Sequence, residues 1–541
     1  MPTEDAVRIV EELARRGYNA EREAVTLLAR TEDTTDAISR AVETAPEGTV
    51  VLSAEHVSST LLDSSRPGPN NAHLRDESVR ENPPHPSAME DSRSQPSSTK
   101  DPSVSTGTHP PEPTPQENSP PVETKGSSEP RASGETTQRT PTPASVSGDI
   151  TSTGTGEYRD FVTVFRSRYE KLADILRGRL THRPAKAVAG LSDGSETGLI
   201  GMVADVRWTS GGHLRFELED TTGTYPCLVL KDREYLDQAS TILHDEVIAV
   251  EGRISKRNSG DEGILFVDEL YFPDIPQRNS PSTADRQVRA ALISDVHVGS
   301  QEFVADAWQR FSSWLHTDDA EDIEYLLIAG DMVEGIGVYP NQDEELDVVD
   351  IYDQYELFSE YLKEVPGDME IVMIPGNHDA VRLAEPQPAF DEELRSIMTA
   401  HDATISANPS MVTIEGVNIL MYHGVSLDEL IAELPDATYD KPAEAMTHLL
   451  RKRHVAPQYG GKTRIAPEEE DHLVMEEVPD IFHAGHVHKF GETRYRGVLT
   501  VNSSCWQSQT DFQKSVNLTP DVAYAPIVEL STLELQYAHF M

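Results

Sequence analysis

Short runs in which hydrophobic and polar residues alternate dominate the middle of the chain. Five such runs, separated by clusters of Gly, Ser, Asn and Asp, lie at residues 197–208, 213–220, 224–232, 246–254 and 264–272. Alternation of this kind predicts strands. Five short strands in succession predict a small, partly open β-barrel of the OB type over residues 191–278. Helix-like spacing at 234–243, between the third and fourth strands, fits the short helix that such barrels often carry.

A different pattern begins at residue 286 and continues to residue 541. Apolar runs alternate with helix-like stretches, which predicts an α/β sandwich with buried strands. Five of the runs, each ending in polar residues, lie at 288–295, 325–331, 370–377, 417–424 and 480–486. Because the carboxyl ends of strands carry the chemistry in folds of this kind, we expect the functional site at these five strand ends.

The segments before the barrel differ sharply in composition. Residues 1–56 show short helical repeats and predict a small helical domain, either a docking module or a simple appendage. Residues 57–155 contain 16 of the 36 prolines and no aromatic side chain, since none occurs between Tyr18 and Tyr158, so we expect a disordered linker. Residues 156–190 predict a connecting helix. Its expected apolar stripe consists of Phe161, Phe165, Tyr169, Leu172 and Leu176.

The charge balance limits what can be inferred about partners. The chain has 93 acidic and 46 basic residues, a formal net charge of −47, and only 12 of the basic residues are Lys. An acidic, Lys-poor chain is typical of a salt-filled cytoplasm, because molar salt shortens the Debye length to about 3 Å and screens self-repulsion. An acidic protein of ordinary salt conditions is the alternative. Under either interpretation, net charge does not exclude a nucleic-acid partner.

Three further features exclude whole classes of protein. No stretch approaches the roughly 20 apolar residues of a membrane span, so we expect no membrane association. The first residues are acidic and lack the apolar segment of a signal peptide, which favours a cytoplasmic location. Two cysteines, Cys227 and Cys505, cannot form a disulfide framework or a thiolate zinc site.

The five strand ends carry residue types that bind metal ions. In chain order they are Asp295 and His297, Asp331, Asn377 with His378, His423, and His486 with His488. In the first and last pairs the ligands are two residues apart, so we expect both side chains on one side of an extended backbone. Each motif alone is weak, because single His and Asp residues are common at turns. Their occurrence together, each after an apolar run, indicates one shared site.

The types of ligand indicate what the site binds. Carboxylate, imidazole and amide groups suit hard to borderline divalent ions, and there are enough of them for two. Two ions about 3.5–4 Å apart can hold a phosphate group and activate water for in-line attack. Asp331 is able to bridge the pair. His378 is better placed as an acid that faces the leaving oxygen, oriented by a carboxylate.

In this order the motifs resemble those of the calcineurin-like metallophosphoesterase superfamily, D-x-H, G-D-x-x-[DE], G-N-H-[DE], H and G-H-x-H. The ligands that the resemblance implies are Asp295, His297, Asp331 and His488 for one ion, and Asp331, Asn377, His423 and His486 for the other. It implies two divalent ions, first of all Mn²⁺, with Fe²⁺ or Mg²⁺ as alternatives. His378 corresponds to the catalytic histidine. Glu334 and Asp379, at the acidic ends of their motifs, correspond to residues that support the ligands.

A closer resemblance extends over residues 157–541. An OB barrel before a phosphoesterase is the arrangement of the B-subunits of replicative DNA polymerases. The stretches 422–431, 454–491 and 502–517 are similar to the small subunits of archaeal DNA polymerase D, also called DNA polymerase II. That family implies a 3′–5′ exonuclease that removes mismatched nucleotides and is bound to a large polymerising subunit, in the cytoplasm at the nucleoid. In eukaryotic B-subunits the metal ligands are degenerate, whereas all of them are intact here, which favours activity.

A basic segment supports a surface that faces DNA or the polymerising subunit. Between Ala445 and Pro467 there is no acidic residue. We expect DNA contacts there, with a helix cap or a protein interface as the alternative. The candidate residues are Arg451, Lys452, Arg453, Lys462, Arg464 and, four residues past His378, Arg382. In the barrel, Trp208, Phe216 and Tyr225 are candidates for stacking on bases, although strand aromatics more often belong to the core.

The motifs predict a two-metal enzyme, and the resemblance together with the OB barrel implies an exonuclease that acts on DNA 3′ ends as the proofreading subunit of an archaeal replicative polymerase. A scaffold subunit with a vestigial site is one alternative. A nuclease of the double-strand-break repair type is another, but those proteins normally begin with the phosphoesterase, whereas about 285 residues precede it here.

Overall fold

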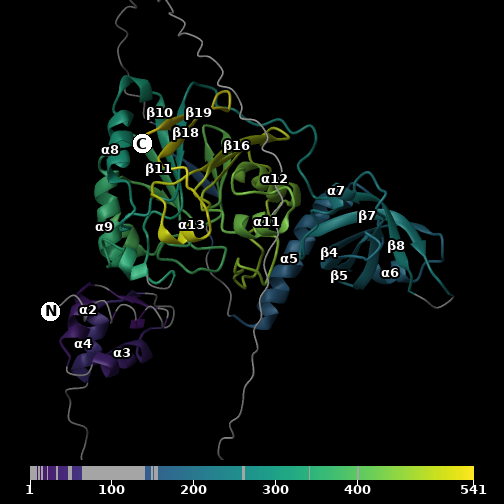
Figure 1. Ribbon diagram of the computed structural model, residues 1–541, viewed down its shortest axis with the longest axis horizontal. Helices are drawn as coiled ribbons and strands as arrows, with labels where there is room; N and C mark the ends of the chain where they lie inside the picture. Colours follow the sequence, from purple (N-terminus) through teal and green to yellow (C-terminus); the bar gives the residue numbers. More distant parts are fainter. Residues whose placement is uncertain are drawn as a thin grey trace, which may run out of the picture. The chain divides into compact units, whose positions relative to one another are not determined.

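The computed structural model of the chain describes residues 9, 12–13, 16, 18–20, 22–31, 34–46, 51–63, 141–147, 150, 156–258, 262–339, 342–398 and 401–541 (Figure 1). Most of the expected linker, 64–140, lies outside the described residues. At its two ends the prediction of disorder over 57–155 is wrong. Helix α4 (Ala54–Asp63) continues past residue 57, where Val57 is buried among the other helices, and strand β3 (Ser145–Ser147) pairs with the edge of a sheet.

The N-terminal unit is built from short helices and a minimal parallel sheet. Besides α4, its elements are α2 (Arg22–Ala29), α3 (Thr34–Glu43), β1 (Asn19–Ala20) and β2 (Val51–Leu52). Apolar residues of α2, α3 and α4, among them Ala24, Leu28 and Ile38, form its core together with Ile9 and Leu13. The parallel pairing of β1 with β2 is an element that the helical spacing did not predict.

The predicted OB barrel is confirmed. Its strands are β4 (Glu196–Trp208), β5 (Leu214–Asp220), β6 (Gly223–Val229), β7 (Val247–Ser255) and β8 (Ile264–Tyr271). They form a closed barrel in the order β4-β5-β6-β8-β7, whereas the sequence predicted a partly open one. Closure comes from β8, which pairs antiparallel with β7 and also parallel with β6 through Cys227 and Leu265. Two short helices, α6 (Ala185–Ala189) and α7 (Leu236–Ala239), contribute buried side chains to the barrel core.

The C-terminal domain is a sandwich of two six-stranded sheets. The first has the order β12 (Thr404–Ile405), β11 (Glu370–Ile374), β10 (Ile323–Ala329), β9 (Arg289–Ile293), β18 (Tyr524–Glu529), β19 (Glu534–His539). The second has the order β16 (Phe490–Tyr495), β17 (Val498–Ser503), β15 (Ile481–Ala484), β14 (Val417–Met421), β13 (Ser410–Ile414), β3. Fully buried residues of both sheets, such as Leu327 and Ile419, pack against each other and form the central core.

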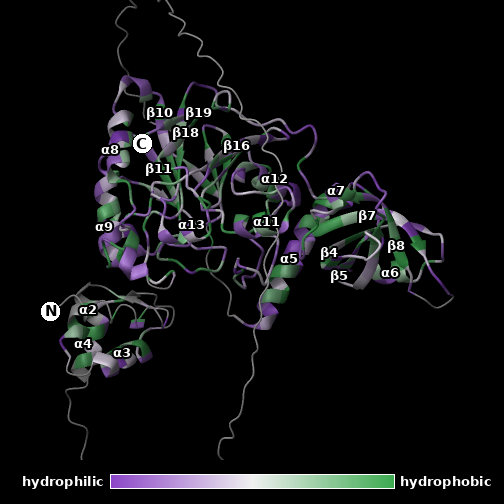
Figure 2. Ribbon diagram, in the orientation of Figure 1, coloured by the Kyte–Doolittle hydropathy of each residue, from purple (hydrophilic) through white to green (hydrophobic). Residues whose placement is uncertain are grey.

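Helices cover the outer faces of the sandwich. Helices α8 (Ala305–Leu315) and α9 (Ile351–Leu362) pack on the first sheet, and α11 (Leu427–Glu433) and α12 (Pro442–Lys452) pack on the second (Figure 1). Both hydrophilic and hydrophobic residues occur along α8 and α9, as expected for helices with one buried face (Figure 2). Shorter helical segments are η1 (Asp318–Ala320), η2 (Gln342–Glu345), α10 (Glu392–Ile397) and α13 (Asp511–Ser515). None of the described helices is long and apolar enough to cross a membrane.

The buried face of the connecting helix α5 (Tyr158–Arg177) overlaps the predicted stripe only in part. Its buried residues are Val164, Arg168, Leu172, Ala173 and Leu176. Leu172 and Leu176 belong to the expected stripe, but Phe161 and Phe165 are only partly buried, and their rings contact Tyr459. Tyr169 is also only partly buried, and the fully buried Arg168, which the stripe did not include, lies on the buried face and donates to Asp471.

Candidate metal centre

Five of the seven predicted ligands have a left-handed backbone. The φ angles are 52° at Asp295, 55° at His297, 52° at Asp331, 71° at His486 and 54° at His488. Strand β9 ends at Ile293, so the prediction of an extended backbone through Asp295 and His297 is wrong. Non-glycine residues in this region cost about 1–3 kcal/mol each and cluster where side chains must be aimed at a ligand. Tight left-handed turns after the strands, rather than strand alternation, bring these side chains together.

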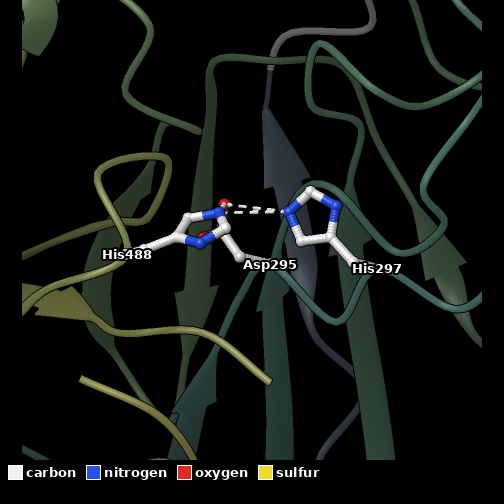
Figure 3. A group of neighbouring side chains, drawn as sticks. All are labelled: Asp295, His297 and His488. Atoms are coloured by element: carbon white, nitrogen blue, oxygen red, sulfur yellow. Dashed lines mark hydrogen bonds and ion pairs between the residues drawn. The ribbon is translucent and has the colours of Figure 1, made fainter. Parts of the chain in front are cut away.

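One group of ligand atoms lies where the loops after β9 and β15 meet. Asp295, His297 and His488 offer ligand atoms that all lie within 4.8 Å of one another (Figure 3). The Nε2 atoms of the two imidazoles are 3.1 Å apart, and Oδ1 of Asp295 is 3.4 Å from Nε2 of His488. On the other side of the His297 ring, Nδ1 lies 2.9 Å from Oε2 of Glu334. This contact leaves Nε2 of His297 directed at the other two ligands.

A second group of ligand atoms begins at Asp331. Asp331, His423 and His486 also have ligand atoms within 4.8 Å of one another. Nε2 of His423 is 3.2 Å from Oδ2 of Asp331 and 3.0 Å from Oδ1 of Asn377. Nδ1 of the same ring is 2.8 Å from the backbone oxygen of Ala329 and donates its hydrogen to it, so Nε2 keeps its lone pair for an ion. The structure thus brings all seven predicted ligands into two adjoining groups.

The electrostatics of the buried site favour a cation. Burial lowers the pKa of His423, but Asp331 beside it outweighs that effect and raises the pKa to about 10. Burial raises the pKa of Glu334, yet His297 and His378 together hold it at about 2. The negative potential that raises the pKa of His423 is the condition that a divalent cation requires, and a bound cation would replace the extra proton at Nε2.

Two glycines make the close approach of the loops possible. A side chain at Gly376 would overlap the Asp331 carboxylate, and one at Gly485 would overlap Asp295. Any other residue at either position would push a carboxylate away from the remaining ligands.

His378 lies beside both groups. Its ring is 4.8 Å from that of His297, its backbone N–H donates to Oδ1 of Asp331 at 2.8 Å, and its side chain is 16% exposed. The sequence predicted that a carboxylate orients this ring. The orienting group is instead the backbone oxygen of Glu334, 2.7 Å from Nδ1, while the Glu334 carboxylate is 3.7 Å away. With Nδ1 used in this way, Nε2 is the nitrogen left for chemistry.

Asp379 organises backbone rather than facing an ion. Its carboxylate accepts hydrogen bonds from the backbone N–H groups of Asp331 and Gly376, both at 2.8 Å, and from Met332 at 3.2 Å. The hydroxyl of Tyr355 donates to it at 3.0 Å. One buried side chain therefore fixes two of the ligand loops against each other.

A cleft of about 700 Å³ opens onto the two groups and is called here the metal-site cleft. His297, Asp331, His378, His486 and His488 line its base. Its walls come from α11 and the loop that follows it, from the loop after α12 that carries Lys462, and from the segment around α13. The ligand groups are therefore reachable from outside, which a purely structural ion would not need.

The structure contradicts two of the predicted DNA contacts. Lys452 is fully buried, and its ammonium group lies 2.7 Å from both Oε2 of Glu246 and the backbone oxygen of Thr241, on the barrel. Arg453 is buried and donates to the backbone oxygens of Met475 and Glu476. Part of the basic segment thus joins the two domains of this chain. The segment contains no acidic residue of its own, and the carboxylate that pairs with Lys452 comes from Glu246, elsewhere in the sequence.

The other predicted contacts differ among themselves. Lys462 is exposed on the wall of the metal-site cleft, and Arg464 is exposed outside the lining of that cleft. Arg451 is half-buried, with its guanidinium group 5.9 Å from the centre of the Tyr495 ring. Arg382 pairs with the buried Glu468 at 2.6 Å and donates to the backbone oxygen of Pro386, which occupies it with structural contacts.

Two of the three barrel aromatics named as stacking candidates belong to the core. Phe216 and Tyr225 are fully buried, and the hydroxyl of Tyr225 donates to the backbone oxygen of Glu262. Trp208, at the end of β4, is 53% exposed. The prediction of base stacking is therefore wrong for Phe216 and Tyr225, because both contribute to the sealed interior of a closed barrel.

Sequence reasoning missed residues that support the ligands. Gln507 donates to Oε2 of Glu334 at 2.7 Å, and Nε2 of Gln513 lies 2.9 Å from Nδ1 of His488. Oδ2 of Asp428 is 3.6 Å from Nε2 of His486. All three occur in stretches that the family resemblance singled out. The signal was present, but polar residues of these types have no spacing rule that assigns them a role.

Comparison with known proteins identifies the family. A DNA polymerase II small subunit from Halobacterium salinarum is 56% identical over 545 aligned residues, which cover 100% of both chains. The chain belongs to the DNA polymerase II small subunit family. A member from Archaeoglobus fulgidus is 44% identical over 383 residues, 69% of this chain and 76% of its own. A member from Pyrococcus furiosus is 41% identical over 388 residues, 69% of this chain and 62% of its own.

Two family models match parts of the chain. The B-subunit family of DNA polymerases alpha and epsilon matches residues 290–492, and the family of OB-fold nucleic acid binding domains matches residues 199–272. Family and fold class are thus as the sequence predicted. Among solved structures, an archaeal phosphodiesterase aligns with 46% of this chain and 99% of its own at 12% identity. The TM-score of 0.24 is too low to show a shared fold.

Proposed function

We propose that this member of the DNA polymerase II small subunit family is a 3′–5′ exonuclease that hydrolyses the terminal phosphodiester of DNA. It works as the proofreading partner of a large polymerising subunit. The observation that carries the proposal is a shared carboxylate. Oδ2 of Asp331 lies 3.2 Å from Nε2 of His423 and 3.8 Å from Nε2 of His297, one from each group of ligands. Two ligand groups that meet at one carboxylate form the arrangement that a two-metal site requires.

The donor set fits two divalent ions such as Mn²⁺, with Fe²⁺ or Mg²⁺ as alternatives. Carboxylate, imidazole and amide donors suit these ions. The Nδ1 atoms face the Glu334 carboxylate at His297 and the Ala329 carbonyl at His423, which leaves both Nε2 atoms available. The residues that would hold the ions are Asp295, His297, Asp331 and His488 for one, and Asp331, Asn377, His423 and His486 for the other. Ions of this kind neutralise charge on the phosphate and lower the pKa of water.

The chain's own residues supply orientation and a proton. His378 presents Nε2 while its Nδ1 is held by the Glu334 carbonyl, so it can protonate the departing 3′ oxygen. Lys462, on the cleft wall, adds positive charge where the DNA backbone would pass. Asp379 keeps the Asp331 and Gly376 backbones in place while substrate binds and leaves.

The test uses the full chain at high KCl with Mn²⁺ and single-stranded DNA labelled at either the 3′ or the 5′ end. Stepwise shortening from the 3′ end, lost in His378→Ala but not in the surface variant Tyr158→Ala, is the expected result. No cleavage by the wild type, alone and with the large subunit added, would leave the scaffold role.

A further inference from the structure

The rim of the metal-site cleft carries an aromatic side chain that the proposed chemistry does not use. Phe512, on α13, lines the cleft and is 64% exposed. Among the described residues its ring packs against no other aromatic ring. Val516, one turn further on, is 54% exposed and lines the same wall, together with Leu518. Leaving this apolar surface in water costs about 25 cal/mol per Å², so a partner that covers it would be favoured.

Helix α13 is rigidly linked to the metal centre. Thr510 and Gln513 form a reciprocal capping box, with each side chain bonded to the backbone N–H of the other. The same Gln513 side chain is 2.9 Å from Nδ1 of His488, a predicted ligand. Phe512 is the residue directly before Gln513. The backbone that carries its ring is therefore anchored to a candidate ligand, His488, rather than being part of a loose loop.

The composition of the cleft favours a nucleic-acid occupant. Its base offers ligands for cations that bind phosphate, and these cations would offset the acidic Asp428 and Asp440, which line the cleft together with Lys462 and Lys489. Nζ of Lys489 lies 3.0 Å from Asp521, whereas Lys462 is exposed. If the phosphates of a DNA strand bind at the bottom of the cleft, the nucleobases attached to them would lie toward its apolar rim. Aromatic side chains beside a phosphate track are how proteins bind unpaired bases of any sequence.

We propose that Phe512, backed by Val516, is a stacking platform for the base of the 3′-terminal nucleotide. This inference rests on the proposed function and assigns it a binding subsite. Within a duplex both faces of a base are covered by its neighbours, so a base reaches the platform only after it has unpaired. Phe512 is then a specificity-determining residue, because stacking on its ring strengthens binding of an unpaired 3′ end and does not strengthen binding of a paired one.

The experiment compares two oligonucleotides that differ only at the 3′ end, one with a terminal thymine base and one with an abasic terminal nucleotide. Affinity is measured with Mn²⁺ on the His378→Ala chain, which keeps binding separate from cleavage. The expected result is about tenfold weaker binding of the abasic end, from the loss of one base–aromatic stack. Adding Phe512→Ala should weaken the base-bearing end to the same level and leave the abasic end unchanged.

Matched variants separate stacking from structural damage. Phe512→Trp keeps a flat ring and should retain the preference, whereas Phe512→Leu keeps apolar bulk without a ring face and should lose it. Tyr158→Ala, which removes an aromatic side chain that is 83% exposed on α5, should change nothing. Mn²⁺ content must be equal in all variants, which shows that Gln513 and His488 are undisturbed.

The outcomes decide between this proposal and the one on which it rests. Equal affinity for the two ends, or a preference that survives Phe512→Ala, would overturn the platform. If Phe512→Ala instead weakens only capture of the large subunit, the rim is a contact between subunits and the platform is wrong. If the base preference depends on Phe512 but the wild type cleaves nothing, the platform stands and the exonuclease proposal fails.

Discussion

Nε of Arg168 donates to Oδ2 of Asp471 at 2.6 Å, and both side chains are buried, although 303 residues separate them in the sequence. Arg168 comes from the connecting helix and Asp471 from the C-terminal domain. The same carboxylate oxygen is 3.0 Å from Nε2 of His454. A buried ion pair of this kind is a point at which one substitution has a large effect.

Arg168→Ala should destabilise the chain strongly, because it leaves the Asp471 carboxylate buried without its charge partner. Breaking such a pair costs about 3–5 kcal/mol of unfolding free energy. Arg168→Ala combined with Asp471→Ala should cost less than the sum of the two single variants. Urea unfolding at high KCl measures all three, and strict additivity would show that the pair contributes no coupling.

Stability should fall in mild acid through His454. Burial, helped by Arg168, lowers its pKa to about 4, and its Nδ1 accepts the backbone N–H of Ala456, which requires a neutral ring. An unfolded His has a pKa of about 6.5, so between these values the unfolded state binds the extra proton. Stability is therefore lost as the pH falls, by about 2 kcal/mol between pH 7 and pH 5 from this group. His454→Gln should show a shallower pH dependence in denaturant unfolding, and an identical slope would contradict the assignment.

Ion stoichiometry should depend on which ligand is removed. The wild type should bind two Mn²⁺ per chain, and His423→Ala should retain one, since His423 belongs to one group only. Asp331→Ala should weaken both sites, because this carboxylate faces both groups. Calorimetric titration and metal analysis of the dialysed protein measure these numbers. Loss of a single ion in Asp331→Ala would show that the carboxylate is not shared.

Substitution of Lys452 should affect stability, whereas substitution of Lys462, ten residues further on, should affect DNA binding. Lys452→Ala should lower unfolding free energy by about 3–5 kcal/mol, because it leaves Glu246 buried without its partner. Lys462→Ala should change stability by less than about 0.5 kcal/mol but weaken DNA binding and reduce its salt dependence by about one unit of log–log slope. Chemical unfolding and DNA titrations across a KCl series test both. DNA binding that depends on Lys452 in a folded variant would contradict the contacts seen here.

The sequence predicted the parts of the fold that rest on local pattern. Alternation predicted all five barrel strands, and the order of the candidate metal-binding motifs predicted that seven side chains converge, as they do in the structure. It failed for Arg168 and Lys452, because the carboxylates that pair with them lie far away in the chain, 303 residues for Asp471 and 206 for Glu246. No spacing rule reports on a partner at that distance. The left-handed turns at Asp295 and His297 were missed for the opposite reason, since strand periodicity was extended beyond the end of the strand.

Strand β3 protects the second sheet from pairing with other polypeptides. Ser145–Ser147 pairs with Thr413–Met411 of β13, which without it would be the outermost strand of the second sheet. An uncovered edge offers unpaired N–H and C=O groups to any other polypeptide. Three residues at the end of a Pro- and Ser-rich segment thus close that edge against strand addition, and a chain shortened to begin at residue 156 would be prone to self-association there.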